Sequence, residues 1–144
     1  MIDYNIISPL AYADDDDDDR MFFQEAIQEI FPDIRMKLFS NGKLLLAYIV
    51  SSLSEENLPR LIFLDLNMPV MNGIECLLEL KKNISTTNIP IVIFTTSSYE
   101  GDRLKLKDMG VNYFFTKETS FEKIQLQLKN IIDTFCQNKS YSNN

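Results

Sequence analysis

The sequence predicts a doubly wound α/β fold, a three-layer sandwich in which helices cover both faces of a five-stranded parallel sheet. Five short apolar runs alternate with five stretches of helical spacing, and this alternation favours parallel β-α-β connections. Two runs, Leu61–Leu64 (LIFL) and Ile91–Phe94 (IVIF), are apolar throughout, as expected for central strands. Ile34–Leu38 alternates with charged residues, which is typical of an edge strand. We therefore expect the strand order 2-1-3-4-5, the flavodoxin-like arrangement.

The first third of the chain contains two of the predicted strands and two of the helices. Pro9–Ala13 (PLAYA) reads as a short strand that stops at a run of six aspartates. Met21–Phe31 is an amphipathic helix, and Pro32 ends it. The edge strand Ile34–Leu38 follows. An Asn-Gly turn then leads into a helix over Lys43–Leu53.

The central part of the chain supplies the two buried strands and the helices that follow them. After Leu61–Leu64, an Asn-Gly pair opens a helix that ends near Lys82. After Ile91–Phe94, the sequence Ser97–Glu100 (SSYE) has the spacing of a capping box and begins a helix to about Met109. Gly110 ends that helix, because glycine readily adopts the left-handed conformation of a helix C-terminus.

The last part of the chain supplies the fifth strand and the fifth helix. Tyr113–Thr116 (YFFT) is the strand, and Thr119–Glu122 (TSFE) has capping-box spacing. The helix that follows places its apolar residues on one face as far as Phe135. We expect one domain over residues 8–135, and we expect residues 136–144, which are polar, to be a disordered tail.

The composition limits the chemistry. The chain has 144 residues, a net charge of −7, two cysteines and no histidine. Absent histidine excludes Ser-His and Cys-His catalysis and any imidazole metal ligand. The acidic balance argues against direct nucleic-acid binding, which needs a basic patch. No apolar run approaches the ~20 residues of a membrane span, and the N-terminus lacks the basic region of a signal peptide. We expect a cytoplasmic protein that contacts no membrane.

Polar side chains follow four of the predicted strands at their carboxyl ends. They are Asp14, Asp15, Asp65, Thr95 and Lys117. In a doubly wound sheet these ends face one crevice, where ligands bind. Three carboxylates in a small volume repel one another, which either raises the pKa of one of them or requires a cation. Oxygen ligands favour a hard divalent ion such as Mg²⁺, with Lys117 as a second counter-charge.

The same residues indicate a reaction. Mg²⁺ usually takes one or two protein carboxylates and leaves coordination positions for water and phosphate oxygens. A carboxylate beside such an ion can accept a phosphoryl group, since aspartyl phosphate is a known type of covalent intermediate. The ion, the ammonium and the hydroxyl would then neutralise and orient the transferred oxygens.

Four motifs, in order and at matching spacing, carry a resemblance to a known family. ADDDDDDR, LDLNMPVMNG, FTTSS and FFTK stand at four strand ends, and the span from about Leu10 to Phe135 resembles the receiver domain of bacterial two-component response regulators. The run DDDDDDR before a helix looks like the single-domain subgroup that includes regulators paired with phytochrome-type kinases.

The resemblance implies roles for the acidic residues. Asp65 would be the phosphoacceptor. Asp15 would bind Mg²⁺ directly, Asp14 would bind it through water, and the backbone carbonyl of Asn67 would complete the protein ligands. Asp16–Asp19 would lie past the metal, in the loop and the first helical turn, where acidic residues favour the positive helix N-terminus.

The resemblance also implies a switch and partners. Thr95 would hydrogen-bond the phosphoryl group, Lys117 would pair with it, and Phe114 stands where the family has its switch aromatic. Glu118 departs from the family, which usually has a proline after the lysine, often in a cis bond; we expect a loop that is either trans and shifted or strained. The phosphoryl donor would be a histidine kinase or a phosphotransfer protein. Output would be a contact of the helix 4, strand 5 and helix 5 face with a downstream protein, with a homodimer left open.

The same residues could also belong to other kinds of site. The aspartate run could be a solvated acidic loop. An EF-hand frame from Asp14 fails because Asp19 stands where that loop needs glycine. A haloacid-dehalogenase-like phosphatase would have a second aspartate where this chain has Asn67. An FMN phosphate would be repelled by the aspartates. Two alternatives stay open: a pseudo-receiver that serves as an interaction module, its site impaired by Glu118, and a Mg²⁺-dependent phosphatase.

On the main interpretation the protein is no enzyme beyond its own phosphorylation and dephosphorylation.

Overall fold

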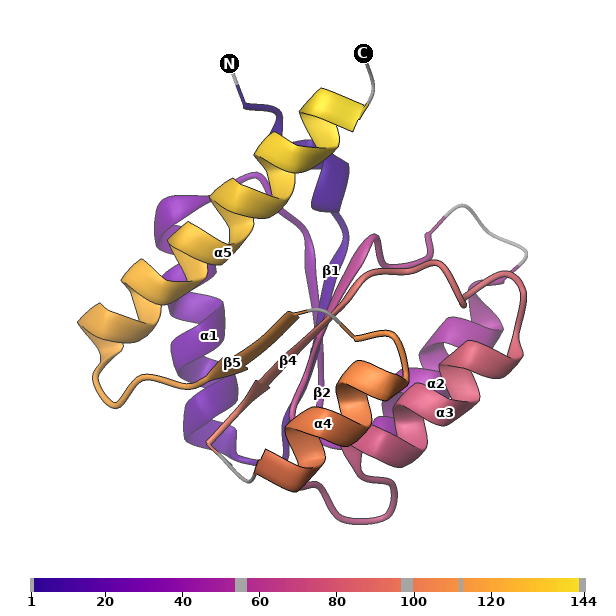
Figure 1. The fold of residues 1–144 in the computed structure, drawn as a ribbon. Helices are drawn as coiled ribbons and strands as arrows, with labels where there is room; N and C mark the ends of the chain where they lie inside the picture. The colour runs from indigo at the N-terminus through magenta and orange to yellow at the C-terminus, as the bar shows by residue number, and fades with distance from the viewer. Residues whose placement is uncertain (1, 54–56, 97–99, 112, 143–144) are drawn as a thin grey trace.

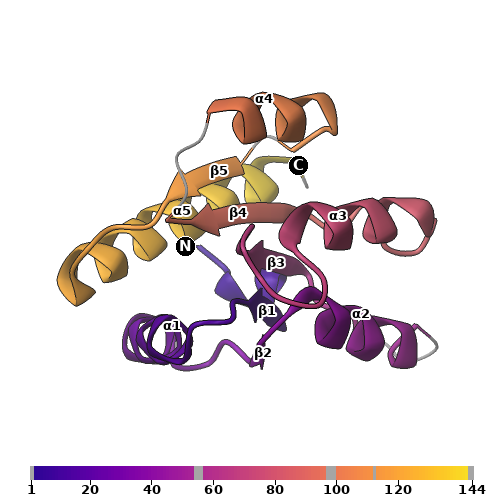
Figure 2. The same cartoon turned by 90° about the horizontal axis from the view of Figure 1, so that it is seen from below.

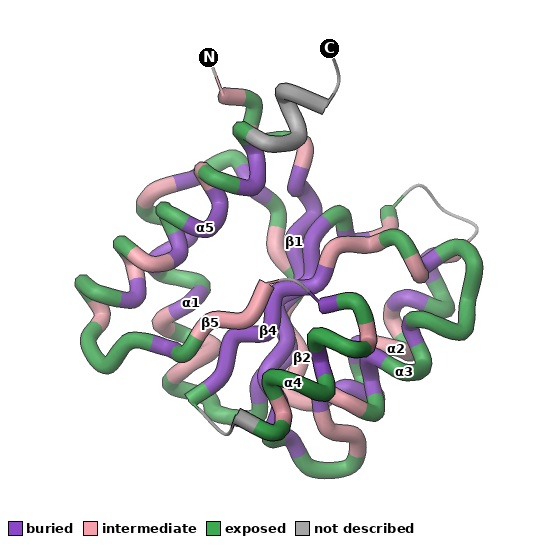
Figure 3. The backbone as a smooth tube through the Cα atoms, viewed as in Figure 1, coloured by how far each residue is buried: buried purple, intermediate pink, exposed green. Residues whose placement is uncertain are grey.

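The computed structural model describes residues 2–53, 57–96, 100–111 and 113–142. Its strands form one parallel sheet in the order β2-β1-β3-β4-β5, which confirms the predicted fold class (Figure 1). The strands are β1 (Leu10–Ala13), β2 (Met36–Phe39), β3 (Leu61–Leu64), β4 (Ile91–Thr95) and β5 (Tyr113–Thr116). β1, β3 and β4 are buried at every residue, whereas the edge strands β2 and β5 are mostly half-buried (Figure 3).

Five α-helices and one short 3-10 helix complete the fold. They are η1 (Tyr4–Ile7), α1 (Asp17–Ile30), α2 (Gly42–Ser51), α3 (Gly73–Lys82), α4 (Glu100–Asp108) and α5 (Phe121–Ser142). α1 and α5 cover one face of the sheet, and α2 and α3 cover the other (Figure 2). In the part of the chain that the structure describes, no helix combines the length and the apolar character that crossing a membrane would require.

The buried core has two halves because successive strand residues point to opposite faces of the sheet. In β1, Leu10 and Tyr12 join the half beneath α1 and α5, while Ala11 and Ala13 join the half beneath α2 and α3. The α1 side is rich in aromatic rings, and Tyr12 is among its largest fully buried side chains. This strand therefore places the ring of one polar aromatic residue among the apolar side chains of that half.

The register of the central strands brings their carboxyl ends level. Ala13, the last residue of β1, pairs with Phe39 on one side and Leu64 on the other. The Asp14 N–H donates to Phe39 O at 2.9 Å, and the Asp65 N–H donates to Ala13 O at 3.0 Å. Asp14 and Asp65 thus leave the sheet side by side, as the predicted strand ends require.

The first helix, α1, begins at Asp17, earlier than the start at Met21 that the apolar periodicity indicated, and Asp16–Asp19 lie in the loop and first helical turn, as the family resemblance implied. Asp16 is its N-cap, and Asp16 Oδ1 accepts the N–H groups of Asp18 at 2.9 Å and Asp19 at 3.0 Å. Asp17, Asp18 and Asp19 occupy the first turn, where carboxylates interact favourably with the helix dipole. The apolar periodicity that placed the start at Met21 marks only the buried part of this helix.

The end of the last helix was also misplaced. α5 continues to Ser142, so ending it near Phe135 was wrong, and Cys136, which we assigned to the tail, is fully buried. The sequence after Cys136 contains neither proline nor glycine, so no residue there stops the helix. At its start, Ser120 Oγ accepts the Lys123 N–H at 3.3 Å, one residue later than the predicted capping box. The domain limits 8–135 stay a prediction.

The sequence also predicted helix starts at the Asn72-Gly73 pair and at Ser97–Glu100. Asn72 forms a full capping box with Glu75 at the start of α3, in which each side chain accepts the backbone N–H of the other residue. The predicted box at Ser97–Glu100 lies partly outside the described residues, and α4 is described from Glu100 to Asp108.

Candidate functional site

Three carboxylates converge where β1 and β3 end. Asp14, Asp15 and Asp65 each offer an oxygen that lies within 4.8 Å of the other two. Asp14 is fully buried, Asp65 is 6% exposed, and Asp15 is exposed. The structure therefore brings together the three acidic residues that the strand ends predicted. Two of them lie where water screens their charges poorly.

Lys117, at the end of β5, lies against these carboxylates. Its side chain is 4% exposed, and its Nζ contacts Asp14 Oδ2, lies 2.9 Å from Asp19 Oδ2 and lies 3.6 Å from Asp65 Oδ2. Burial alone would lower the pKa of this ammonium, but the hydrogen bond to Asp14 and the charges of Asp14 and Asp65 outweigh it and raise the pKa above its ordinary value. Lys117 thus remains a fixed positive charge in the pocket.

Asp65 is held by two donors and one charge. Its Oδ1 accepts the Leu66 N–H at 2.8 Å, and the Thr95 side chain also hydrogen-bonds this carboxylate. Burial raises the pKa of Asp65 to about 6, and the charge of Asp14 adds to the rise, against the opposing effects of Lys117, Thr95 and the Leu66 N–H. A carboxylate so crowded gains from any further positive charge beside it.

Asp14 has donors that the sequence analysis did not foresee. Its Oδ2 accepts a hydrogen bond from the Tyr12 hydroxyl, and its Oδ1 accepts the Asp16 N–H at 3.0 Å. The Arg20 guanidinium donates to the backbone oxygen of Asp14 at 2.7 Å. Tyr12 reads as a strand residue and Asp19 as one more aspartate of a run, so only the fold reveals that both contact the pocket.

Glycine is required where α3 passes the loop after Asp65. A Cβ built on Gly73 would lie 2.3 Å from Asp65 O and 2.9 Å from Leu66 Cα, closer than any side chain tolerates. The Gly73 N–H also donates to Leu66 O at 2.9 Å. The start of α3 therefore locks the backbone that carries Asp65. Asn67, whose carbonyl we expect to be a ligand, lies exposed in the same loop.

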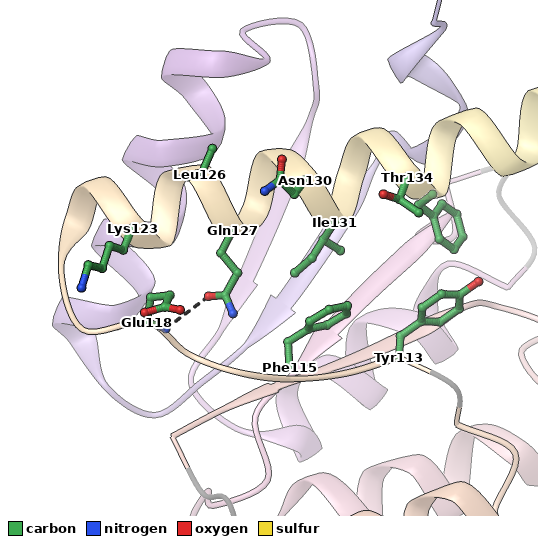
Figure 4. A pocket seen from close by; sticks show the side chains of 10 residues that line it. Tyr113, Phe115, Glu118, Lys123, Leu126, Gln127, Asn130, Ile131 and Thr134 are labelled. Atoms are coloured by element: carbon green, nitrogen blue, oxygen red, sulfur yellow. Dashed lines mark hydrogen bonds between the residues drawn. The ribbon is translucent and has the colours of Figure 1, made fainter.

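The loop after Lys117 is ordered by a side chain of α5. The Lys117 N–H donates to Thr95 O at 2.8 Å. The Glu118 N–H donates to Gln127 Oε1 at 3.2 Å (Figure 4). Gln127 Nε2 donates to Thr116 O at 2.8 Å. Among the residues that the structure describes, the cis peptide bond is Ser8–Pro9, so the bond before Glu118 is trans. The trans alternative holds, and Lys117 still enters the pocket.

Phe114 lies on β5, and β4 separates it from β3, the strand that Asp65 follows. It pairs in register with Ile93 and packs, partly buried, against the core beneath α2 and α3. The Arg103 guanidinium of α4 lies 5.1 Å from the centre of its ring. Thr95, two residues beyond Ile93, is fully buried. Neighbouring residues thus link the pocket to α4: Thr95 and Ile93 on β4, Phe114 on β5 and Arg103 on α4.

Comparison with known proteins shows the family to which this chain belongs. Residues 10–129 match the family described as "Response regulator receiver domain". The chain belongs to this family. Its members are phosphorylated signalling modules rather than classical enzymes, and the acidic pocket of Asp14, Asp15 and Asp65 with Lys117 is consistent with a phosphoaccepting response regulator.

Stand-alone regulators are among the similar receivers. The chain is 31% identical over 117 residues to the response regulator Rcp1 of Synechocystis, covering 80% of each chain. The phosphorylated cyanobacterial phytochrome response regulator RcpA superposes with a TM-score of 0.78 at 28% identity, over 85% of this chain and 89% of that one. The Mn²⁺-bound form of Rcp1 superposes with a TM-score of 0.79 at 26% identity, over 88% and 93%.

The residues of this receiver fit a divalent cation. Three carboxylate oxygens within 4.8 Å of one another form a donor set of the kind that hard cations prefer. Lys117 faces these carboxylates but also pairs with Asp19, so a divalent ion would supply positive charge that the ammonium alone does not. The related Rcp1 structure with bound Mn²⁺ agrees with a divalent site in this fold.

Proposed function

We propose that this receiver accepts a phosphoryl group on Asp65 in a Mg²⁺-dependent reaction. The observation that carries the proposal is the approach of Asp65 to Asp14 and Asp15, with Lys117 Nζ 3.6 Å from Asp65 Oδ2. Asp15 would hold the ion directly, Asp14 through water, and Asp65 and the Asn67 carbonyl would complete the ligands. Bound Mg²⁺ would supply positive charge to the phosphoryl oxygens.

The remaining work falls to the side chains of the protein. A carboxylate oxygen of Asp65 attacks phosphorus, and the bond from phosphorus to the donor breaks, so its electron pair leaves with the donor imidazole or carboxylate. Lys117 pairs with a phosphoryl oxygen in place of the free Asp65 carboxylate. The Thr95 hydroxyl turns from Asp65 to the phosphoryl group and donates to it. Later attack by water returns the free carboxylate and inorganic phosphate.

The movement of Thr95 gives the phosphoryl group a way to change a distant surface. Phosphorylation moves the Thr95 hydroxyl from Asp65 to the phosphoryl group and lets Phe114 rotate inward, which shifts the face of α4, β5 and α5. This face contains a largely apolar cavity of about 560 Å³ between β5 and α5, whose lining includes Tyr113, Phe115 and Ile131 (Figure 4). Such a surface suits a downstream protein or a second copy of the receiver.

The donor we propose is a histidine kinase or a phosphotransfer protein. The family receives its phosphoryl group within two-component signalling, and RcpA is described as a phytochrome response regulator. A kinase of the phytochrome type is therefore the first candidate partner for this chain. The protein would act in the cytoplasm, where such kinases present their phosphohistidine.

Intact-protein mass spectrometry after incubation with acetyl phosphate tests the proposal. Wild type with Mg²⁺ should carry one phosphoryl adduct, and wild type with EDTA should carry none. Asp65→Ala should abolish the adduct. The matched control is Asp18→Asn, an exposed aspartate of the first turn of α1, which should keep the adduct.

The open alternatives give different results in the same experiment. A pseudo-receiver would bind Mg²⁺ and form no adduct, which would contradict the proposed function. A phosphatase would consume many equivalents of a phosphomonoester. The trans loop at Glu118 and the position of Lys117 inside the pocket weigh against an impaired site.

A further inference from the structure

Tyr12 is a polar side chain in the middle of a buried strand, and the mechanism above gives it no role. Its side chain is 1% exposed. Its ring stacks on Phe23 with 4.1 Å between ring centroids and meets Phe94 edge-on at 6.2 Å. A phenylalanine would fill this space equally well, so packing explains the ring of Tyr12 and leaves the hydroxyl unexplained.

The hydroxyl reaches the candidate cation site. It donates to Asp14 Oδ2, the same oxygen that Lys117 Nζ contacts. The ammonium also lies 5.8 Å from the centre of the Tyr12 ring. Tyr12 therefore contacts the two groups of opposite charge that are buried most deeply in the pocket.

Counting acceptor sites shows what this contact does to Asp14. A carboxylate has about four acceptor sites, two on each oxygen. Tyr12 and Lys117 take both sites of Oδ2, and the Asp16 N–H takes one site of Oδ1. One site of Oδ1 remains for a cation or for a water molecule bound to it. Because Asp14 is fully buried, bulk water cannot replace a lost donor.

We propose that Tyr12 is a positioning residue for the divalent cation: its hydroxyl fixes the Asp14 carboxylate so that the open acceptor site of Oδ1 serves the ion. Groups that orient a metal-binding side chain affect the affinity for the metal although they never touch it. The inference rests on the proposed function, since it assumes that Asp14 contributes to a cation site.

The test compares Mg²⁺ binding by the wild type and Tyr12→Phe, measured on the full chain by isothermal titration calorimetry and, with Mn²⁺ as the probe, by electron paramagnetic resonance. The variant should bind one ion with a Kd raised about tenfold. Phosphorylation by acetyl phosphate should need correspondingly more Mg²⁺ for half-saturation, while its rate at saturating Mg²⁺ stays near that of the wild type. A change in core packing alone would not produce this separation.

Tyr4→Phe is the matched control. Its hydroxyl also donates to a carboxylate, Asp133 Oδ1 at 2.6 Å, but Tyr4 precedes the amino end of β1, whereas the pocket lies at the carboxyl end of that strand. Removing it should leave the Mg²⁺ affinity unchanged. A Kd of Tyr12→Phe within about twofold of the wild type, or a tighter one, would overturn the inference.

A measurement on the wild type guards against a variant that fails to fold. With tyrosines labelled with ¹³C at Cζ, the Tyr12 resonance should shift during a Mg²⁺ titration with the Kd found by calorimetry, and the Tyr4 resonance should stay in place. A Tyr12 resonance that does not move would contradict the inference. If the wild type binds no Mg²⁺, the proposed function and the inference fail together; if it binds and the Tyr12 tests are negative, only the inference fails.

Discussion

At the residue scale, the aspartate run shows how position gives identical side chains different roles. Asp14 is fully buried among donors, and Asp15 stands exposed beside it at the candidate cation site. Asp16 caps α1, and Asp17 pairs with Arg20. Asp19 reaches back to Lys117 at 2.9 Å. Residues of the run therefore line the candidate cation site, cap α1 and supply a counter-charge to Lys117. These separate contacts explain how the chain tolerates six aspartates in a row.

Gly73→Ala should damage both stability and the site. The added methyl group would meet the backbone of Asp65 and Leu66, which cannot move without shifting the end of β3. We expect a loss of about 1–3 kcal/mol in the free energy of unfolding, the usual range for overpacking. Urea denaturation measures the loss, and Mg²⁺ titration should show weaker binding.

Gly110→Ala separates this steric effect from backbone strain. Gly110 has a φ of +87°, and a Cβ there would meet nothing within 4 Å. Its replacement should cost about 1 kcal/mol through strain alone and leave Mg²⁺ binding unchanged. Normal Mg²⁺ affinity in Gly73→Ala would show that the approach of α3 does not shape the site.

At the element scale, a side chain of α5 holds the connection from β5 to α5. Glu118 stands in this connection, where the family resemblance led us to expect a proline. Gln127 projects from α5 and accepts a hydrogen bond from the Glu118 N–H (Figure 4). Its side-chain amide also donates to Thr116 O. These two bonds span both sides of Lys117 in the sequence. A side chain of α5 therefore restrains this loop on both sides of Lys117.

Gln127→Ala should loosen that connection. We expect a stability loss of about 1 kcal/mol, since each exposed hydrogen bond contributes modestly, together with slower phosphorylation by acetyl phosphate at saturating Mg²⁺. The control is Gln125→Ala on the same helix, which should leave the rate unaltered. Equal rates for the two variants would argue that the loop holds Lys117 without help from Gln127.

At the scale of the whole molecule, a hydrogen bond joins η1, near the start of the chain, to α5, near its end. The Tyr4 hydroxyl of η1 donates to Asp133 Oδ1 of α5 at 2.6 Å, and Tyr4 also packs on Phe31 with 4.5 Å between ring centroids. The bond to Asp133 raises the pKa of Tyr4 to about 12. Slight burial would raise the pKa of Asp133, but bonds from Lys129 and Tyr4 outweigh it and lower that pKa.

This pair should make stability depend on pH at both extremes. Because the folded-state pKa of Asp133 is lowered, its contribution is full above the ordinary value of 3.8 and disappears as the pH falls through the lowered pKa. Because the pKa of Tyr4 is raised, its contribution is full below 10.0 and disappears as the pH rises through about 12.

Tyr4→Phe gives the corresponding measurement. At pH 7 we expect a loss of about 1–2 kcal/mol in the free energy of unfolding, as for a partly exposed bond to a charged acceptor. The difference from the wild type, followed by urea denaturation, should shrink as the pH falls below 3.8. A difference that stays constant from neutral to acidic pH would contradict the role of the Asp133 charge.

The sequence by itself determined the sheet order, and it placed Asp14, Asp15, Asp65, Thr95 and Lys117 at or just after the carboxyl ends of four strands. It could do so because apolar runs and their periodicity are local patterns, and because parallel strands place their carboxyl ends at one edge. Family membership then followed from four motifs at those ends, and the comparison with known receivers confirmed it.

Only the tertiary structure decided which side chains complete the pocket. Tyr12 reads as a core residue, Asp19 as one of a run and Gln127 as a polar position on a helix. In the structure Tyr12 contacts Asp14, Asp19 contacts Lys117 and Gln127 contacts Glu118. The bond from Asp19 to Lys117 joins residues 98 positions apart. Such contacts depend on how whole elements pack against one another, and local patterns carry no record of that packing.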